Sequence, residues 1–348
     1  MSFTNDKRFK IKKYLLGKIE TESKDFVKKT TDTYGISTTT VYRYLNELEN
    51  QGVIIKDDNK KYRLIKKTKS FFLERKKDQI KDEDLIYKKY IADMLTEYGD
   101  NIKRIWNYAF TEMMNNVIDH SEASRVVVFV CQDYMKTQIL IEDNGVGIFR
   151  KIKEYYGYST LDDAVHELFK GKLTTDSKNH SGEGIFFTSR ALDTFAALSD
   201  GKIFTHDKYV EAVESLENIE GLKTWKEKRG TTIIMGLSNF SNRNLKEVFD
   251  MFADVDGGFT KTHVPIKNIF EDDPVSRSQA KRLCHRFEKF EEVELDFEGI
   301  NEIGQGFAHE IFVVFQNNYK NIKLTPINMT EEVEKMIRHV TLSNPQLS

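Results

Sequence analysis

The segments AFTEMMNNVIDHSEA (109–123), DNGVGI (143–148) and SGEGI (181–185) decide the predicted fold of this chain. In the first segment, apolar residues recur at helical spacing and predict one buried helix face, formed by Phe110, Met113, Met114, Val117 and Ile118. Glu112 and Asn116, four residues apart, are neighbours on the other side of that helix. A carboxylate and an amide one turn apart suit Mg²⁺, which takes oxygen ligands. Strand-like runs follow at 125–132 and 137–143, and the second leads directly into DNGVGI.

The order of these motifs carries more information than any one of them, because DNG turns and single GxG stretches are common. A helix with E-x-x-x-N, a strand followed by DNGVGI, and GEGI opening a second helix resemble the ATP-binding domain of the GHKL superfamily, the Bergerat fold of gyrase, histidine kinases and MutL. The resemblance covers roughly residues 85–240. It implies a central α/β sandwich over 85–264 with ATP and Mg²⁺ as cofactors.

The resemblance implies a role for each matching position. Glu112 is the candidate catalytic base, which would activate the attacking water, and Asn116 is the candidate metal ligand. Asp143 would accept a hydrogen bond from the adenine amino group, with Thr231 of the RGTTI stretch bonding nearby. Glycines let the backbone approach the base, and free N–H groups at a helix N-terminus meet phosphates. The other nucleotide-contact candidates lie in the two glycine motifs and between them: Gly145, Gly147, Ile148, Lys172, Thr174, Gly182, Gly184 and Ile185.

The interval 149–181 corresponds to the ATP lid of that superfamily, a segment that closes over the phosphates. Ser159 is expected to cap a helix over 161–171, and the run 172–176 resembles the lid threonine run of sensor kinases. Lys170, Lys172 and Lys178 are phosphate-contact candidates, with a solvated lysine face as the alternative. Beyond the lid we expect one apolar helix over 185–198, a surface excursion over 207–230, and strands near 202–206 and 231–237 that complete the sandwich.

Composition places limits on the whole chain. A length of 348 residues predicts two or three domains. No stretch is apolar for eighteen residues and the amino terminus lacks a signal-peptide core, so we expect neither a membrane span nor secretion. Cys131 and Cys284 form no metal spacing or disulfide framework, which favours a cytoplasmic protein. Net charge is −2, but the first 77 residues hold about twenty Lys and Arg against about ten Asp and Glu.

This basic end is predicted to form three helices, over 8–20, 23–35 and 37–52, followed by a hairpin over 53–67. Ser23 and Ser37 are the expected N-caps, and the hairpin turns at Asp57–Asn59. The pattern resembles a winged helix-turn-helix domain over 1–67, which lays its third helix in the major groove and its wing along the backbone. DNA-binding candidates are Thr38, Thr39, Thr40, Tyr42 and Arg43 on the helix and Lys60, Lys61 and Arg63 on the wing. Protein docking is the alternative, and residues 68–84 are expected to be a linker.

The region 265–348 is predicted to alternate helices and strands. It resembles the STAS-like fold of anti-sigma factor antagonists over 265–342, and LDFEGINEIGQGFAHEIF (295–312) aligns with that family's strand–loop–helix signature. In the family a loop serine is phosphorylated by a GHKL partner kinase. Here the aligned position is Gln305, between Gly304 and Gly306, so the loop has no hydroxyl for phosphoacceptor chemistry. Nucleotide-sensitive docking of a protein partner stays open.

Three functions fit these motifs. The first is a DNA-binding regulator whose central domain binds ATP and Mg²⁺, with slow hydrolysis and with lid state coupled to both flanking domains. The second is an ATPase proper, driven by Glu112. The third is a protein serine kinase of the anti-sigma type, because His120 completes a Glu112-x-x-x-Asn116-x-x-x-His120 pattern. We expect the first, with ATP hydrolysis more than phosphotransfer to protein, and with homodimerisation by analogy to many GHKL proteins.

Overall fold

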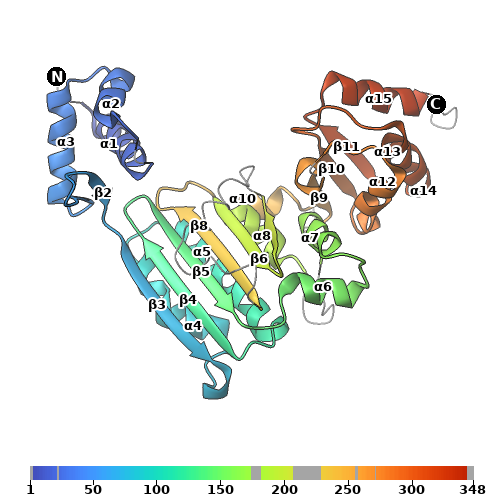
Figure 1. Cartoon of the computed structure of the whole chain (residues 1–348), viewed down its shortest axis with the longest axis horizontal. Helices are drawn as coiled ribbons and strands as arrows, with labels where there is room; N and C mark the ends of the chain where they lie inside the picture. Colours follow the sequence, from blue (N-terminus) through green and yellow to red (C-terminus); the bar gives the residue numbers. More distant parts are fainter. Residues whose placement is uncertain are drawn as a thin grey trace.

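The computed structural model shows a mixed α/β protein, and the part of the chain that it describes contains three separate sheets (Figure 1). The structure describes residues 3–21, 23–173, 182–206, 229–254, 258–270 and 272–342. Within these ranges no helix combines the length and the apolar character needed to cross a bilayer.

Residues 3–21 and 23–64 form a unit with its own core, which we call the N-terminal unit. It consists of α1 (Asn5–Glu20), α2 (Phe26–Tyr34), α3 (Thr38–Asn50) and an antiparallel hairpin of β1 (Ile54–Lys56) and β2 (Tyr62–Leu64). Its buried side chains include Ile11, Leu15, Val41, Tyr44 and Leu48. Ser37 caps α3 as expected, because its Oγ accepts from the N–H of Thr40 at 3.2 Å. Ser23 does not cap α2, which begins after Asp25 in a left-handed conformation.

The central sheet has six antiparallel strands in the order β3-β4-β5-β8-β6-β7. Their bounds are β3 (Lys67–Glu74), β4 (Arg125–Gln132), β5 (Lys136–Asp143), β6 (Thr194–Ser199), β7 (Lys202–Thr205) and β8 (Thr231–Ser238). Strict alternation of buried and partly exposed residues along β5 shows that one face of the sheet packs against the core.

Two strands differ from the sequence prediction. The expected linker 68–84 begins with β3, which lies at the edge of the sheet. Most residues of β3 are exposed, including Lys67 and Lys69, so its sequence lacks the apolar pattern of a buried strand. The expected helix over 185–198 is α8 (Gly184–Ala191) followed by β6. Both halves are apolar because both are buried, and periodicity alone cannot separate them. The excursion expected at 207–230 lies outside the described residues except for its last two.

Helices cover one face of the central sheet (Figure 1). They are α4 (Glu83–Tyr90), α5 (Asp100–His120), α8 and α10 (Leu245–Asp250), with short 3₁₀ turns η1 (Arg75–Lys77) and η2 (Ala92–Leu95). The apolar stripe of α5 is buried as expected: Trp106, Phe110 and Met114 have no exposed surface. α6 (Ile148–Tyr156) and α7 (Leu161–Lys170) follow β5. The cap of α7 is Thr160, which forms a capping box with Asp163, and Ser159 has no such role.

The third sheet is parallel, in the order β11-β10-β9. It consists of β9 (Lys261–Pro265), β10 (Glu292–Asp296) and β11 (Lys323–Ile327), so it begins four residues upstream of the expected boundary at 265. Its helices are α11 (Ile266–Ile269), α12 (Arg277–Cys284), η4 (Phe287–Lys289), α13 (Gln305–His309), the π-helical stretch η5 (Glu310–Phe315), α14 (Gln316–Asn318) and α15 (Glu331–Leu342). Thr330 caps α15, as expected.

The N-terminal unit packs against one end of the central sheet. Phe240, just after β8, contacts the ring of Phe9 at 5.0 Å and that of Tyr134 at 5.3 Å between centroids. Lys136 at the start of β5 forms an ion pair with Glu20 of α1 at 2.6 Å. Only Ile65 and Lys66 separate β2 from β3, and the N–H of Ile65 is bonded to the carbonyl of Val53.

Candidate functional site

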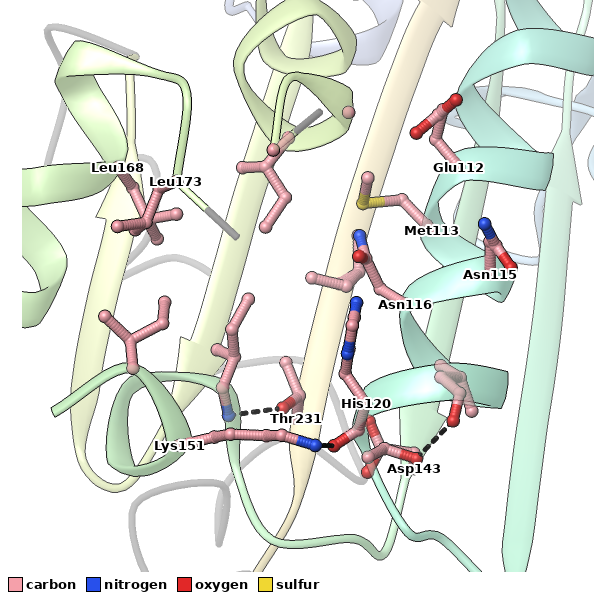
Figure 2. Close-up of a pocket in the computed structure, with 18 of the residues that line it drawn as sticks. Glu112, Met113, Asn115, Asn116, His120, Asp143, Lys151, Leu168, Leu173 and Thr231 are labelled. Atoms are coloured by element: carbon pink, nitrogen blue, oxygen red, sulfur yellow. Dashed lines mark hydrogen bonds between the residues drawn. The ribbon is translucent and has the colours of Figure 1, made fainter. Parts of the chain in front are cut away.

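A cavity of about 340 Å³ opens between α5, the turn after β5, α6, α8 and the start of β8. Figure 2 shows the side chains that line it. Most of the candidates from the sequence lie in this lining: Glu112, Asn116, Asp143, Gly147, Ile148, Gly182, Gly184, Ile185 and Thr231. These residues come from segments up to about 120 positions apart in the chain. The fold therefore brings the three motifs around one space.

The α5 wall of the cavity carries the polar residues of the E-x-x-x-N-x-x-x-H pattern. Glu112, Asn116 and His120 succeed one another along the helix and border the cavity (Figure 2). Their spacing of four places them on one side of α5 while Phe110 and Met114 are buried in the core. The wall thus presents a carboxylate, an amide and an imidazole in a row.

Gly184, at the start of α8, makes room for the Glu112 carboxylate. A Cβ on Gly184 would lie 2.2 Å from Glu112 Oε2, so the Glu112 carboxylate would have to move away from the first turn of α8. A helix N-terminus favours negative charge nearby because its first N–H groups lack partners within the helix. The glycine therefore lets one acidic side chain and the first turn of α8 share the same end of the cavity.

Asp143 lies at the opposite end of the cavity and is only 5% exposed. Its Oδ1 accepts a hydrogen bond from the N–H of Gly145 at 2.7 Å. Burial raises the pKa of Asp143 to about 6, although hydrogen bonds from the backbone of Gly145 and Thr231 act to lower it. Gly145 itself is required by space, since a Cβ there would lie 2.0 Å from the carbonyl oxygen of Ser121.

Thr231 and the DNGVGI turn are joined by a hydrogen bond. The N–H of Ile148 donates to Thr231 Oγ1 at 3.0 Å, which links the first turn of α6 to the start of β8. Gly147 has a positive φ of 89°, and a Cβ there would lie 2.5 Å from Asp200 Oδ2. Asp143, Ile148 and Thr231 are thereby held together at the floor of the cavity.

Lys151 is a cavity residue that the sequence did not indicate. It extends from α6 across the cavity floor, where its Nζ donates to the carbonyl oxygen of His120 at 2.5 Å (Figure 2). A carbonyl at the C-terminal end of α5 is a favourable partner for a cation. Its position one helical turn after Gly147 could have indicated it, because the first turn of α6 borders the cavity.

The lysines proposed to contact phosphate lie elsewhere. Lys172 is directed away from the cavity, because its Nζ donates to the carbonyl of Lys289 at 2.8 Å. Lys170 is 1% exposed and its Nζ donates to Glu167 Oε1 at 2.7 Å. Leu173, which lines the cavity, donates its N–H to the carbonyl of Gly182 at 3.0 Å. Thr174 and Lys178 lie outside the described residues.

The volume of the cavity lies within the usual range of small-ligand sites. Small-ligand sites usually measure about 300–1,000 Å³ and are apolar with a few placed polar groups. Among the described residues, no cluster of three or more His, Cys, Asp or Glu side chains is arranged to hold a metal. Mg²⁺ often keeps several waters and takes phosphate oxygens alongside one or two protein ligands. The oxygens of Asn116 and Glu112 on one wall fit that mode of binding.

The DNA-binding candidates lie on the surface of the N-terminal unit. Thr38, Thr39, Tyr42 and Arg43 are exposed on α3, and Thr40 is partly buried beside Ser37. Lys60 and Lys61 are exposed at the turn of the hairpin. The Arg63 Nε lies 2.7 Å from Asp57 Oδ2, so part of its charge is balanced within the hairpin.

The observed architecture is that of a mixed α/β protein with several sheets. Residues 279–334 match a protein family described as a STAS-like domain of unknown function (DUF4325). This match confirms the STAS-like prediction for the C-terminal part of the chain, and it runs from α12 into α15, including β10 and β11. A comparison with curated proteins gives no match. Gln305 lies within the matched segment and begins α13, with Gly304 as its N-cap.

Proposed function

We propose that the central cavity binds ATP with Mg²⁺, and that its nucleotide state is coupled to a DNA-binding N-terminal unit and to the STAS-like domain. The observation that carries the proposal is the placement of Glu112, Asn116 and Asp143 around one cavity. These are the positions for which the GHKL resemblance implies the base, the metal ligand and the adenine acceptor. The cytoplasm is the proposed location.

The floor of the cavity would hold the adenine. Asp143 is a buried acceptor, and a hydrogen bond from the adenine amino group would compensate a carboxylate that water no longer solvates. A buried acceptor also discriminates, because a base without a donor at that place leaves the carboxylate unpaired. The hydrogen bond from the N–H of Ile148 to Thr231 holds the backbone together at the same end of the cavity.

The other end would hold the phosphates. Gly182 and Gly184 border the cavity at the first turn of α8, where unpaired N–H groups receive anions. Glu112 and Asn116 lie beside this turn. Mg²⁺ on Asn116 would neutralise phosphate charge. Glu112 would take a proton from a water whose oxygen bonds to the γ-phosphorus while the P–O bond to ADP breaks, so that ADP and phosphate are released.

A second function, a protein serine kinase, is favoured by one observation. The family match places a STAS-like domain in the same chain as the cavity, and related domains are phosphoacceptors in the family that the sequence resembles. Gln305 offers no hydroxyl at the aligned position, so the acceptor would be a serine of a separate protein.

The decisive experiment uses the purified full-length protein with MgATP labelled in the γ-phosphate. Binding is followed by calorimetry, and released phosphate and protein-bound phosphate are counted with and without duplex DNA. Binding with slow release that changes on adding DNA supports the regulator. Fast release that does not depend on DNA indicates an ATPase proper. Label transferred to a separate STAS-like protein with a loop serine, added to the reaction, indicates a kinase. Absence of MgATP binding would reject the whole proposal.

A further inference from the structure

The segment that ends α7 is held by the STAS-like domain. We call Gly171, Lys172 and Leu173 the lid base, because they directly follow α7 within the interval 149–181 that is expected to be the lid. Arg286, which follows α12, is 3% exposed and has a left-handed backbone with φ 67°. Its Nη2 donates to the carbonyl oxygens of Gly171, at 3.4 Å, and of Lys172. Its Nη1 donates to Glu167 Oε2 at 3.0 Å.

A buried ionic network surrounds this contact. Lys170 Nζ donates to Glu167 Oε1 and also to the carbonyl oxygens of Arg282, at 3.2 Å, and His285, at 2.8 Å. Although burial acts to raise it, the pKa of Glu167 is lowered to about 2 by Lys170, His285 and Arg286. Breaking such a group by removing one partner leaves a buried charge uncompensated. The end of α7 and the segment after α12 are therefore one connected polar unit.

Further contacts continue the same attachment along the chain. Thr262 of β9 donates to the carbonyl of Lys170 at 2.7 Å. Three successive carbonyls, of residues 170, 171 and 172, thus accept from the C-terminal part of the protein. Lys172 Nζ adds its bond to the carbonyl of Lys289 and lies 4.9 Å from the ring centre of Phe290. Figure 1 shows α7 between the central sheet and β9.

The lid base is also a wall of the central cavity. Gly171 and Leu173 both line it, together with Leu168 of α7. The N–H of Leu173 is bonded to the carbonyl of Gly182, which leads into the first turn of α8. Gly171 has φ 81°, and a Cβ there would lie 2.8 Å from the Phe259 ring, so the turn packs closely against Phe259 and admits no larger residue at this position. Arg286 thus donates directly to a residue that lines the cavity, Gly171.

We propose that Arg286 is a positioning residue for the central cavity, and that through it the STAS-like domain regulates nucleotide binding. Arg286 fixes the carbonyls of Gly171 and Lys172, which sets where Leu173 and Gly182 border the cavity. Any change in the STAS-like domain that displaces Arg286 then alters nucleotide affinity. By reciprocity, nucleotide binding biases the segment around Arg286 by the same factor. This inference rests on the proposed nucleotide function.

The test compares full-length Arg286→Lys with Arg338→Lys, a matched control whose side chain is exposed on α15. Lysine at 286 keeps the charge beside Glu167 but loses the two-pronged donation to the lid base. We expect MgATP affinity to fall on the order of tenfold in Arg286→Lys and to stay unchanged in the control. Hydrogen exchange at the Leu173 amide should become faster in the same variant without nucleotide.

Thr262→Val is a milder second variant, since it removes one hydrogen bond to Lys170 with little change in volume and no change in charge. It should give a smaller loss in both measurements, and circular dichroism checks that each variant is folded. A folded Arg286→Lys protein with wild-type MgATP affinity and wild-type exchange at Leu173 would overturn the inference. If the wild type binds no MgATP, the proposed function fails, and exchange at Leu173 alone then decides the positioning role.

Discussion

Folding favours the protonated form of Asp143, whereas the proposed binding of adenine uses its ionised form. Burial raises its pKa above that of a carboxyl in an unfolded chain. The stability that protonation of Asp143 provides is therefore fully present below the ordinary carboxyl pKa and is lost as the pH rises through about 6. At neutral pH the ionised side chain costs the folded protein stability. That cost is what a donor such as an adenine amino group would offset.

Asp143→Asn should accordingly stabilise the protein while removing nucleotide binding. We expect a gain of at most about 3 kcal/mol in the free energy of unfolding at pH 8, since each pKa unit corresponds to about 1.4 kcal/mol. The gain should shrink towards pH 4, where the wild-type carboxyl is protonated. Denaturant unfolding at both pH values measures it, and calorimetry with MgATP measures binding. A variant that binds MgATP with wild-type affinity removes Asp143 as the base-recognising residue.

Glu112→Gln should keep MgATP binding and lose phosphate release, because glutamine preserves shape and cannot accept the proton of the attacking water. Loss of a general base commonly lowers turnover by about 10²–10⁴-fold. The matched control is Asp119→Asn, an exposed carboxylate on the same helix that should leave turnover unchanged. Phosphate release under single-turnover conditions is the measurement, and wild-type release from Glu112→Gln would exclude the role.

At the scale of elements, local signals in the sequence predicted local structure well. The Ser37 cap, the Asp57 turn and the alternation along β5 each act within a few residues, and the structure contains the predicted cap, turn and strand. The prediction that Ser159 caps α7 was wrong, because the cap is the next residue, Thr160. Thr160 and Asp163 have capping-box spacing, so the correct signal was present.

Elements that depend on distant partners were not predictable in this way. β3 is a strand because β4 pairs with it about 58 positions later, and its charged outer residues conceal the apolar pattern. Lys170 and Lys172 were assigned to phosphate, but each donates to backbone carbonyls more than 110 positions away in the STAS-like region. Composition near a lysine cannot reveal such contacts. The cavity motifs were predictable because their order in the chain, rather than their neighbours in space, carries the resemblance.

The exposed face of α3 and the hairpin leads to a prediction for DNA. Arg43→Ala with Lys61→Ala should weaken duplex binding and reduce its dependence on salt, because fewer phosphates are neutralised. Lys7→Ala with Lys10→Ala, an exposed pair on α1, is the control with equal charge change. Electrophoretic or fluorescence titrations at several salt concentrations give the slope. Equal effects of the two double variants would indicate attraction by overall charge, without a defined interface.

At the scale of the molecule, β5 connects two sites. It begins at Lys136, beside the N-terminal unit, and ends at Asp143, in the cavity, a span of about 25 Å for eight residues. β8 runs beside it in the opposite direction, from Thr231 in the cavity to Ser238 near Phe240. A stiff pair of strands therefore separates the candidate nucleotide and DNA sites.

Phe240→Ala should loosen the N-terminal unit from the sheet, because it removes the ring that contacts Phe9 and Tyr134. We expect any effect of MgATP on DNA affinity to shrink while each site keeps its own ligand affinity. Phe72→Ala is the control, an aromatic residue of the same sheet that is 67% exposed. Limited proteolysis between β2 and β3 should accelerate only in Phe240→Ala. Unchanged proteolysis and unchanged coupling would show that this contact transmits nothing.

The two-residue connection between β2 and β3 bears on how copies of the protein would arrange themselves on a duplex. Ile65 and Lys66 reach about 7 Å, and Ile65 is already bonded to the hairpin. If DNA is bound on α3, so short a connection fixes the side of the double helix on which the cavity lies. The duplex turns once in about 10 base pairs, so copies half a turn apart would face away from each other. Copies a whole turn apart would face the same way, and the spacing of sites would decide which nucleotide domains can meet.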